Sequence, residues 1–231
     1  MWYKLKRIMM RPNGVEKQIR PDNRWRPWAN TLLYCPFKTD INDYSSNSQT
    51  TTLAWGNWIW TIWNISCLAS SWVNVDFWYP MNFSWTISSW RYVPASQVWQ
   101  FSSWRDASYQ AIWFFNDYWY NRLRFTQYAY DLDVSFSQSN VWVNAITTYD
   151  YSGSNWKVSL YINWWLATSA NPSKYSIPNT SSYRTLHIWW RWSSDTHYQG
   201  NWISEFIVED KVRTAQEISD YYDLTKWDYW L

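Results

Sequence analysis

Residues 142–168 read WVNAITTYDYSGSNWKVSLYINWWLAT, and this stretch decides the fold class. Apolar side chains alternate along KVSLYI at 157–162, which is the period of a β-strand with one buried face. Asn163 and Trp164 then form a two-residue turn, and a short return strand follows at 166–168. The stretch therefore predicts a β-hairpin, preceded by a strand that WVNAITTY forms.

The same pattern extends over the chain from residue 30 onward. Short segments rich in Tyr, Phe, Val, Ile and Thr alternate with clusters of Ser, Asn and Asp. Regular short strands of this kind are typical of two antiparallel sheets packed face to face. We therefore predict an all-β, antiparallel two-sheet jelly-roll sandwich. The expected strands are at 32–37, 65–68, 73–77, 82–87, 97–101, 109–115, 121–127, 131–137, 142–149, 157–162, 166–168, 185–188 and 203–208.

One short helix is predicted near the C-terminus. Thr214 and Glu217 have the spacing of a capping box, in which each side chain serves a backbone N–H group of the other residue. Ile218, Tyr221 and Tyr222 then fall on one helical face. We expect this face to pack on the sandwich.

Positive charge is concentrated at the N-terminus. Residues 1–26 contain eight Lys or Arg and two acids, a local net charge of +6, which leaves −4 for the rest because the total is +2. We therefore divide the chain into a basic extended arm at 1–28 and one domain at 29–231. The arm is expected to dock on a larger assembly or an anionic surface; the alternative is a solvated tail.

Targeting and redox signals are sparse. Residues 1–12 are basic without a following apolar segment, and no run approaches the ~18 apolar residues of a membrane span, so we expect neither a standard leader nor a span. Cys35 and Cys67 are too few for a disulfide scaffold, and we expect two small buried residues, with one bridge as the alternative.

The chain has 25 Trp and only 4 Gly, whereas average glycine usage of about 7% corresponds to roughly 16 residues. Trp164, Trp189 and Trp190 lie where a turn favours glycine. A type I′ turn needs positive φ at both central residues, which costs Trp roughly 1–2 kcal/mol. We hypothesise that many of these Trp stand for Gly, because the source is a bacterium or phage that reads UGA as glycine. The alternative, a sugar-stacking surface of exposed Trp, explains a few Trp but not 25.

Three segments carry a family resemblance: WVNAITTYD at 142–150, KVSLYINWWLAT at 157–168 and NWISEFIVEDKVRTAQEISDYY at 201–222. They resemble laminin-G-like domains of the concanavalin A-like lectin and glucanase superfamily. The resemblance is good over 140–225 and weaker over 30–140, and it departs from the family where Trp replaces Gly in turns. The matching residues are Trp142, Tyr149, Asp150, 160–163, Ile203, Glu205 and the helix at 214–222.

The resemblance implies a concanavalin A-like sandwich that acts as a non-catalytic binding or adhesion module at a cell surface. Its ligand would be a glycan or a protein, held on the concave sheet or on rim loops at 151–156 and 191–200. Many members also bind calcium at a rim, through clustered oxygen ligands. The candidate ligand-binding residues are Tyr151, Asn155, Trp192, Asp195 and Tyr198, and the candidate calcium ligands are Asp150 and Asp195, which as turn-forming residues need no metal.

Other functions find less support in the sequence. A structural protein of a phage tail, virion or cell surface is the main alternative, because the basic arm fits a docking segment. A glycoside hydrolase needs two carboxylates about 5–10 Å apart, but Glu205 and Glu209 would lie about 13 Å apart along one strand. His187 and His197 have no partner at metal-ligand spacing, and only the arm is basic enough for nucleic acid.

The recoding hypothesis is tested by the coding sequence. We expect UGA at positions 164, 189 and 190, because these turn contexts favour glycine most strongly. UGG at all three positions would remove the basis of the hypothesis.

Overall fold

The structure is a computed structural model. It describes residues 30–37, 40–53, 59–62, 65–69, 73–76, 84–93, 100–105, 111–117, 120–127, 130–135, 138–151, 157–171, 185–188 and 202–229. The arm predicted at 1–28 and its boundary with the domain lie outside these residues. No helix among the described residues is long and apolar enough to cross a membrane.

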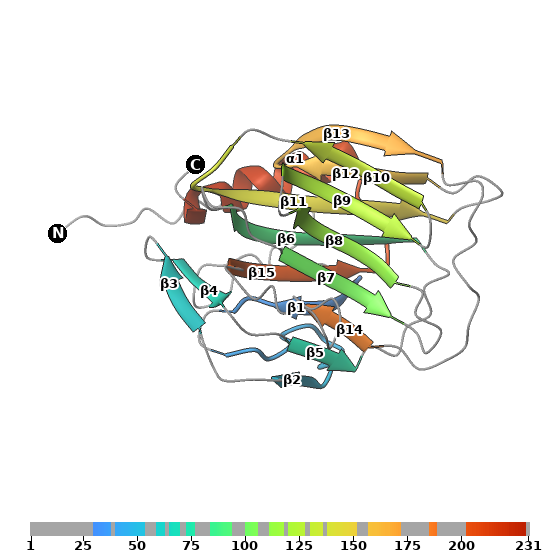
Figure 1. Cartoon of the computed structure of the whole chain (residues 1–231). Helices are drawn as coiled ribbons and strands as arrows, with labels where there is room; N and C mark the ends of the chain where they lie inside the picture. Colours follow the sequence, from blue (N-terminus) through green and yellow to red (C-terminus); the bar gives the residue numbers. More distant parts are fainter. Residues whose placement is uncertain are drawn as a thin grey trace, which may run out of the picture.

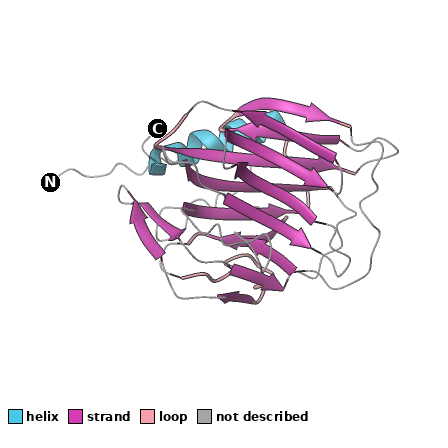
Figure 2. Ribbon diagram, in the orientation of Figure 1, coloured by secondary structure: helices cyan, strands magenta, loops and turns pink. Residues whose placement is uncertain are grey.

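The described part of the chain is almost entirely antiparallel β-structure (Figure 1; Figure 2). In chain order the elements are β1 (Thr31–Cys35), β2 (Thr51–Leu53), β3 (Ile59–Ile62), β4 (Ile65–Ala69), β5 (Val73–Asp76), β6 (Trp85–Val93), β7 (Gln100–Arg105), β8 (Ala111–Asp117), β9 (Tyr120–Gln127), β10 (Tyr130–Ser135), β11 (Val141–Asp150), β12 (Lys157–Ile162), β13 (Trp165–Ala170), β14 (Thr185–Ile188), β15 (Trp202–Glu209), α1 (Ala215–Thr225) and the 3-10 helix η1 (Lys226–Tyr229).

The strands form two sheets that lie face to face, which agrees with the predicted all-β sandwich (Figure 1). The eight-stranded sheet has the order β13-β12-β11-β6-β15-β4-β3, with β1 also paired to β15. The seven-stranded sheet has the order β10-β9-β8-β7-β14-β5-β2. Neighbours such as β6 and β15 are far apart in sequence, so the sheets are held together by long-range pairing.

The predicted hairpin is present, with one difference in its turn. β12 and β13 pair antiparallel, and Asn163 and Trp164 connect them. Asn163 has a φ of 59°, as expected, but Trp164 is not among the described non-glycine residues with positive φ. The turn therefore lacks the two positive φ values of type I′, and Trp164 does not carry the expected backbone strain. Asn163 instead binds β11: its side-chain Oδ1 accepts from the backbone N–H of Asn144 at 3.0 Å.

The middle of the eight-stranded sheet is buried on both faces, whereas β13 is partly exposed. Trp85 and Ile87 of β6 belong to the core between the sheets, whereas Trp90 and Tyr92 belong to a second cluster under the C-terminal helices. All nine residues of β6 are buried for this reason. The strand was predicted at 82–87, and in the structure it continues to Val93, with Ser88, Ser89 and Arg91 buried as well.

The C-terminal helix begins as predicted and packs through the predicted face. Thr214 caps α1, and Glu217 completes the capping box. Ile218 and Tyr221 are buried against the eight-stranded sheet, in the cluster that also contains Trp90. The ring of Trp90 stacks on Tyr229 at 4.1 Å between centroids, and its indole N–H donates to Thr225 Oγ1 at 3.2 Å. An aromatic layer therefore fixes both α1 and η1 to the sheet.

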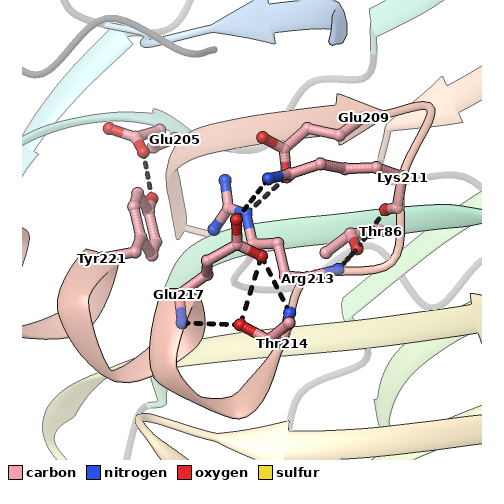
Figure 3. A network of polar contacts seen from close by, with 8 residues as sticks. All are labelled: Thr86, Glu205, Glu209, Lys211, Arg213, Thr214, Glu217 and Tyr221. Carbon is pink, nitrogen blue, oxygen red and sulfur yellow. Dashed lines mark hydrogen bonds and ion pairs between the residues drawn. The ribbon is translucent and has the colours of Figure 1, made fainter. Parts of the chain in front are cut away.

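A polar network joins the start of α1 to the end of β15 (Figure 3). Arg213 forms an ion pair with Glu209, and both side chains are completely buried. The Tyr221 hydroxyl donates to Glu205, and the guanidinium of Arg213 lies 4.4 Å from the centroid of the Tyr221 ring. Burial raises the pKa of Tyr221, and the nearby Glu205 carboxylate adds to the rise, so the phenol stays protonated and keeps its donor.

The loop before β2 covers one edge of the sheet. Asp43 accepts the backbone N–H of Tyr34 through Oδ1 at 2.8 Å, and the backbone N–H of Tyr44 donates to the carbonyl of Tyr34 at 2.8 Å. Asn47 donates from its side chain to the carbonyl of Thr31 at 2.9 Å. These bonds satisfy groups on the outer side of β1 that another strand could otherwise pair with.

The sequence analysis missed β2 and β3 and interpreted the cysteines correctly. β2 and β3 have three and four residues, too few for a period of two to stand out. Cys35 and Cys67 are both free and buried. Cys35 lies in the core between the sheets and Cys67 in the cluster under the helices, so the sheet separates them.

The buried ion pair makes a prediction about stability. Arg213→Met is expected to lower the free energy of unfolding by about 3–5 kcal/mol, because it leaves the Glu209 carboxylate buried without its cation. Urea unfolding followed by tryptophan fluorescence measures this. Lys226→Met is the control: it removes an ion pair with Asp223 that is partly exposed, and should cost at most ~1 kcal/mol. Equal effects of the two changes would contradict the role given to Arg213.

Candidate functional site

Two of the predicted site residues lie together at one end of the sandwich. Asp150 is the last residue of β11, and Tyr151 follows it; both are partly buried. The other four candidates, Asn155, Trp192, Asp195 and Tyr198, lie outside the described residues. The site is therefore built around Asp150 and Tyr151.

An aromatic column connects this strand end to the core. Tyr151 stacks on Tyr149 with 6.3 Å between ring centroids and 25° between planes. Tyr149 stacks in turn on Trp85 at 5.2 Å and 17°, and Trp85 lies 6.5 Å from Phe125 of the opposite sheet. Tyr149, Trp85 and Phe125 are completely buried. The ring of Tyr151 is therefore the outermost member of a column whose inner members are held by the core.

Polar groups lie beside the backbone at the end of β11. The backbone N–H of Tyr151 donates to Ser84 Oγ at 2.9 Å, and Ser84 Oγ donates to Asp150 Oδ1 at 3.5 Å. Lys157, which is exposed, is the cross-strand partner of Asp150. The end of β11, the start of β12 and the residue before β6 thus carry four kinds of group. They are the partly buried ring of Tyr151, the Asp150 carboxylate, the Lys157 ammonium group and the Ser84 hydroxyl.

The sequence analysis missed Ser84 and Lys157. β6 pairs with β11 so that Trp85 lies opposite Tyr149, which brings Ser84 to Asp150 across 66 positions of the chain. No local signal could show that pairing. The register of the hairpin partner could have indicated Lys157, because the pairing of β11 with β12 places it opposite Asp150.

Electrostatics favour a neutral phenol inside the column. Burial raises the pKa of Tyr149, and the neighbouring Tyr151 raises it further. Tyr149 therefore remains an uncharged aromatic ring across the physiological pH range, as stacking in the core requires.

A calcium site was expected from the family resemblance, but the described part of the chain contains no cluster of metal-ligating side chains that would support it. There, no group of three or more His, Cys, Asp or Glu side chains is placed to hold a metal ion. Asp150 accepts a hydrogen bond from Ser84 through Oδ1. The other candidate ligand, Asp195, lies outside the described residues.

The carboxylates considered for glycoside hydrolysis do not line an open groove. Glu205 and Glu209 are both buried beneath the C-terminal helix. Glu205 accepts the Tyr221 hydroxyl and Glu209 is paired with Arg213 (Figure 3). Each one fixes the helix to the sheet, as expected for Glu205; the expectation that Glu209 belongs to a solvated strand end is wrong, because its side chain is buried in the ion pair.

The chain is similar to known proteins in structure but has no match by sequence. No protein-family model matches the chain, and no curated protein matches it. Among solved structures, the receptor-binding domain of botulinum neurotoxin D superposes with a TM-score of 0.67 at 14% identity, covering 84% of this chain and 52% of that chain. The binding domain of botulinum neurotoxin serotype D/C gives 0.61 at 18% identity, with 84% and 52% coverage.

A third structure belongs to botulinum neurotoxin type C, whose cell entry depends on interaction with two ganglioside molecules. It gives a TM-score of 0.63 at 17% identity, covering 84% of this chain and 51% of that chain. At these identities the likeness shows the fold alone. The chain spans about half the length of each of these three structures. These neighbours are binding domains rather than catalytic ones.

The column predicts different roles for its two tyrosines. Tyr149→Ala should lower the free energy of unfolding by about 3–5 kcal/mol, because it removes a completely buried ring between two others. Tyr151→Ala should cost about 1 kcal/mol, because its ring is only partly buried. Urea unfolding and near-ultraviolet circular dichroism measure both. Similar losses for the two variants would show that Tyr151 is part of the core and not a surface residue.

Proposed function

We propose that the protein is a non-catalytic binding module that holds a glycan against Tyr151 at the end of the sandwich. The observation that carries this proposal is the position of that ring. It is partly exposed, and the buried rings of Tyr149 and Trp85 stack behind it. A protein ligand is the other class that such a surface could bind.

The chemistry of the site suits a sugar ring. The apolar face of a pyranose packs against an aromatic face, and Tyr supplies contact area at a low cost in conformational entropy. The column lowers that cost further, because the Tyr151 ring is already positioned before a ligand arrives. The Ser84 hydroxyl, the Asp150 carboxylate and the Lys157 ammonium group supply the mixed donors and acceptors that sugar hydroxyls need.

The fold supports the binding class independently. The botulinum neurotoxin domains that share it are receptor-binding domains, and one of these toxins interacts with gangliosides, which are glycan-bearing lipids. From these neurotoxin domains we take only the class of ligand, a glycan, into the proposal for this chain. We also propose membership of the laminin-G-like group on the residues at 142–168 and 201–222, and a contribution of the loops at 152–156 and 191–200 to the same site.

A glycan array with matched variants tests the function. The unmodified chain should bind at least one glycan, and Tyr151→Ala should weaken that binding at least tenfold, because it removes the stacking platform. Tyr44→Ala is the matched control: it removes another exposed tyrosine, which lies in the loop before β2 and is 40% exposed.

The proposal requires that the Tyr151→Ala and Tyr44→Ala variants differ in glycan binding. Equal binding by the Tyr151→Ala and Tyr44→Ala variants, with both folded, would place the ligand elsewhere. An array without any signal, together with capture of a purified protein ligand, would shift the function to protein recognition.

A further inference from the structure

Tyr151 is the first residue after β11, and it lies beyond the backbone pairing of that strand with β6. The last pair between the two strands is Tyr149 with Trp85. Residues just past a strand end open easily, because they make fewer hydrogen bonds to a neighbouring strand. The aromatic platform therefore depends on a backbone position that the ladder between β6 and β11 does not include.

A side-chain hydrogen bond begins where the ladder ends. The backbone N–H of Tyr151 donates to Ser84 Oγ at 2.9 Å, although the two residues are 67 positions apart in the chain. Ser84 directly precedes β6, so a hydroxyl oxygen takes the place that a strand carbonyl has within the ladder. The same hydroxyl donates to Asp150 Oδ1 at 3.5 Å. The backbone after β11 is thus tied to the residue before β6.

The hydroxyl of Ser84 is well suited to this bond. Ser84 and Tyr151 are both partly buried, so water competes less for the bond than it would on an open surface. A hydroxyl can accept one hydrogen bond while it donates another, as Ser84 does between Tyr151 and Asp150. Alanine at position 84 would remove this acceptor and leave the rest of the strand end in place.

Two contacts together define the position of the Tyr151 ring. The stack on Tyr149 places the ring, with 6.3 Å between centroids, and the bond to Ser84 places the backbone from which the ring extends. A ring held by the stack alone moves away with its backbone whenever the strand end opens. A ligand that needs the stacked ring then binds more weakly, in proportion to the fraction of molecules in which the ring is in place.

We propose that Ser84 is the positioning residue of the aromatic platform: its hydroxyl holds the backbone of Tyr151 and thereby keeps the ring on Tyr149 in the orientation that a ligand meets. The consequence for ligand affinity rests on the proposed function, whereas the effect on the backbone and the ring does not. Ser84 acts in this role through Tyr151, separately from any bond that its hydroxyl makes to a sugar.

Amide hydrogen exchange and fluorine NMR test the positioning without a ligand. Ser84→Ala should raise the exchange rate of the Tyr151 N–H by about threefold to tenfold, because one partly buried hydrogen bond is lost. In protein labelled with 3-fluorotyrosine, the signal that Tyr151→Phe removes should shift toward that of the free amino acid. Ser84→Thr keeps the hydroxyl and should restore both readouts. An unchanged exchange rate or fluorine signal in Ser84→Ala, or no rescue by Ser84→Thr, would overturn the proposal.

Glycan binding gives a further readout. On a glycan that the chain binds, Ser84→Ala should lower the affinity by about threefold to tenfold, and Ser84→Thr should restore it. Added to Tyr151→Ala, the Ser84→Ala change should have no further effect, because no ring is left to position. Ser45→Ala is the matched control: it removes another serine hydroxyl that accepts a backbone N–H, that of Asn47 at 3.2 Å, in the loop before β2, and should leave the affinity unchanged.

The outcomes separate this inference from the proposed function. Equal losses from Ser84→Ala with and without the Tyr151 ring would show that the hydroxyl binds the sugar directly, and would overturn the positioning role, as would an equal loss from Ser45→Ala. If Tyr151→Ala weakens binding and Ser84→Ala does not, the proposed function stands and the positioning role fails. If no glycan binds, the proposed function fails, while the exchange rate and the fluorine signal still decide the role of Ser84.

Discussion

Burial of the middle of the eight-stranded sheet on both faces is the constraint on which the rest of the structure depends. One face packs on the seven-stranded sheet, and the other packs under α1 and η1. Strands β6 and β15 are therefore buried along almost their whole length. Polar residues in these strands must find partners inside the protein, because a buried polar group without one is costly.

The charged residues under the helix follow from that constraint. Arg213 and Glu209 are both removed from water, and each compensates the charge of the other. Thr86 of β6 accepts the backbone N–H of Arg213 at 2.9 Å and donates to the carbonyl of Lys211 at 2.7 Å, which fixes the turn between β15 and α1 (Figure 3). The same residues that resemble an acidic motif in the sequence thus hold the helix in place.

The packing of the core also positions one aromatic residue at the end of β11. The rings in contact from Phe125 to Tyr151 run from the space between the sheets to the end of β11. A surface residue with such support needs little further ordering when a ligand binds. The position of the Tyr151 ring therefore depends on the packing of the core behind it.

The sequence by itself determined the β-class, the hairpin at 157–168 and the capped helix after Thr214, because their signals are local periods and local hydrogen bonds. Through the family resemblance it also named Tyr151 as a candidate ligand-binding residue and Asp150 as a candidate calcium ligand. It did not determine the length of β6, whose polar residues are buried by partners distant in sequence. Only the tertiary structure brought Ser84 to Asp150 and separated buried Trp90 from exposed Trp164, because strand register and burial depend on contacts between residues far apart in the chain.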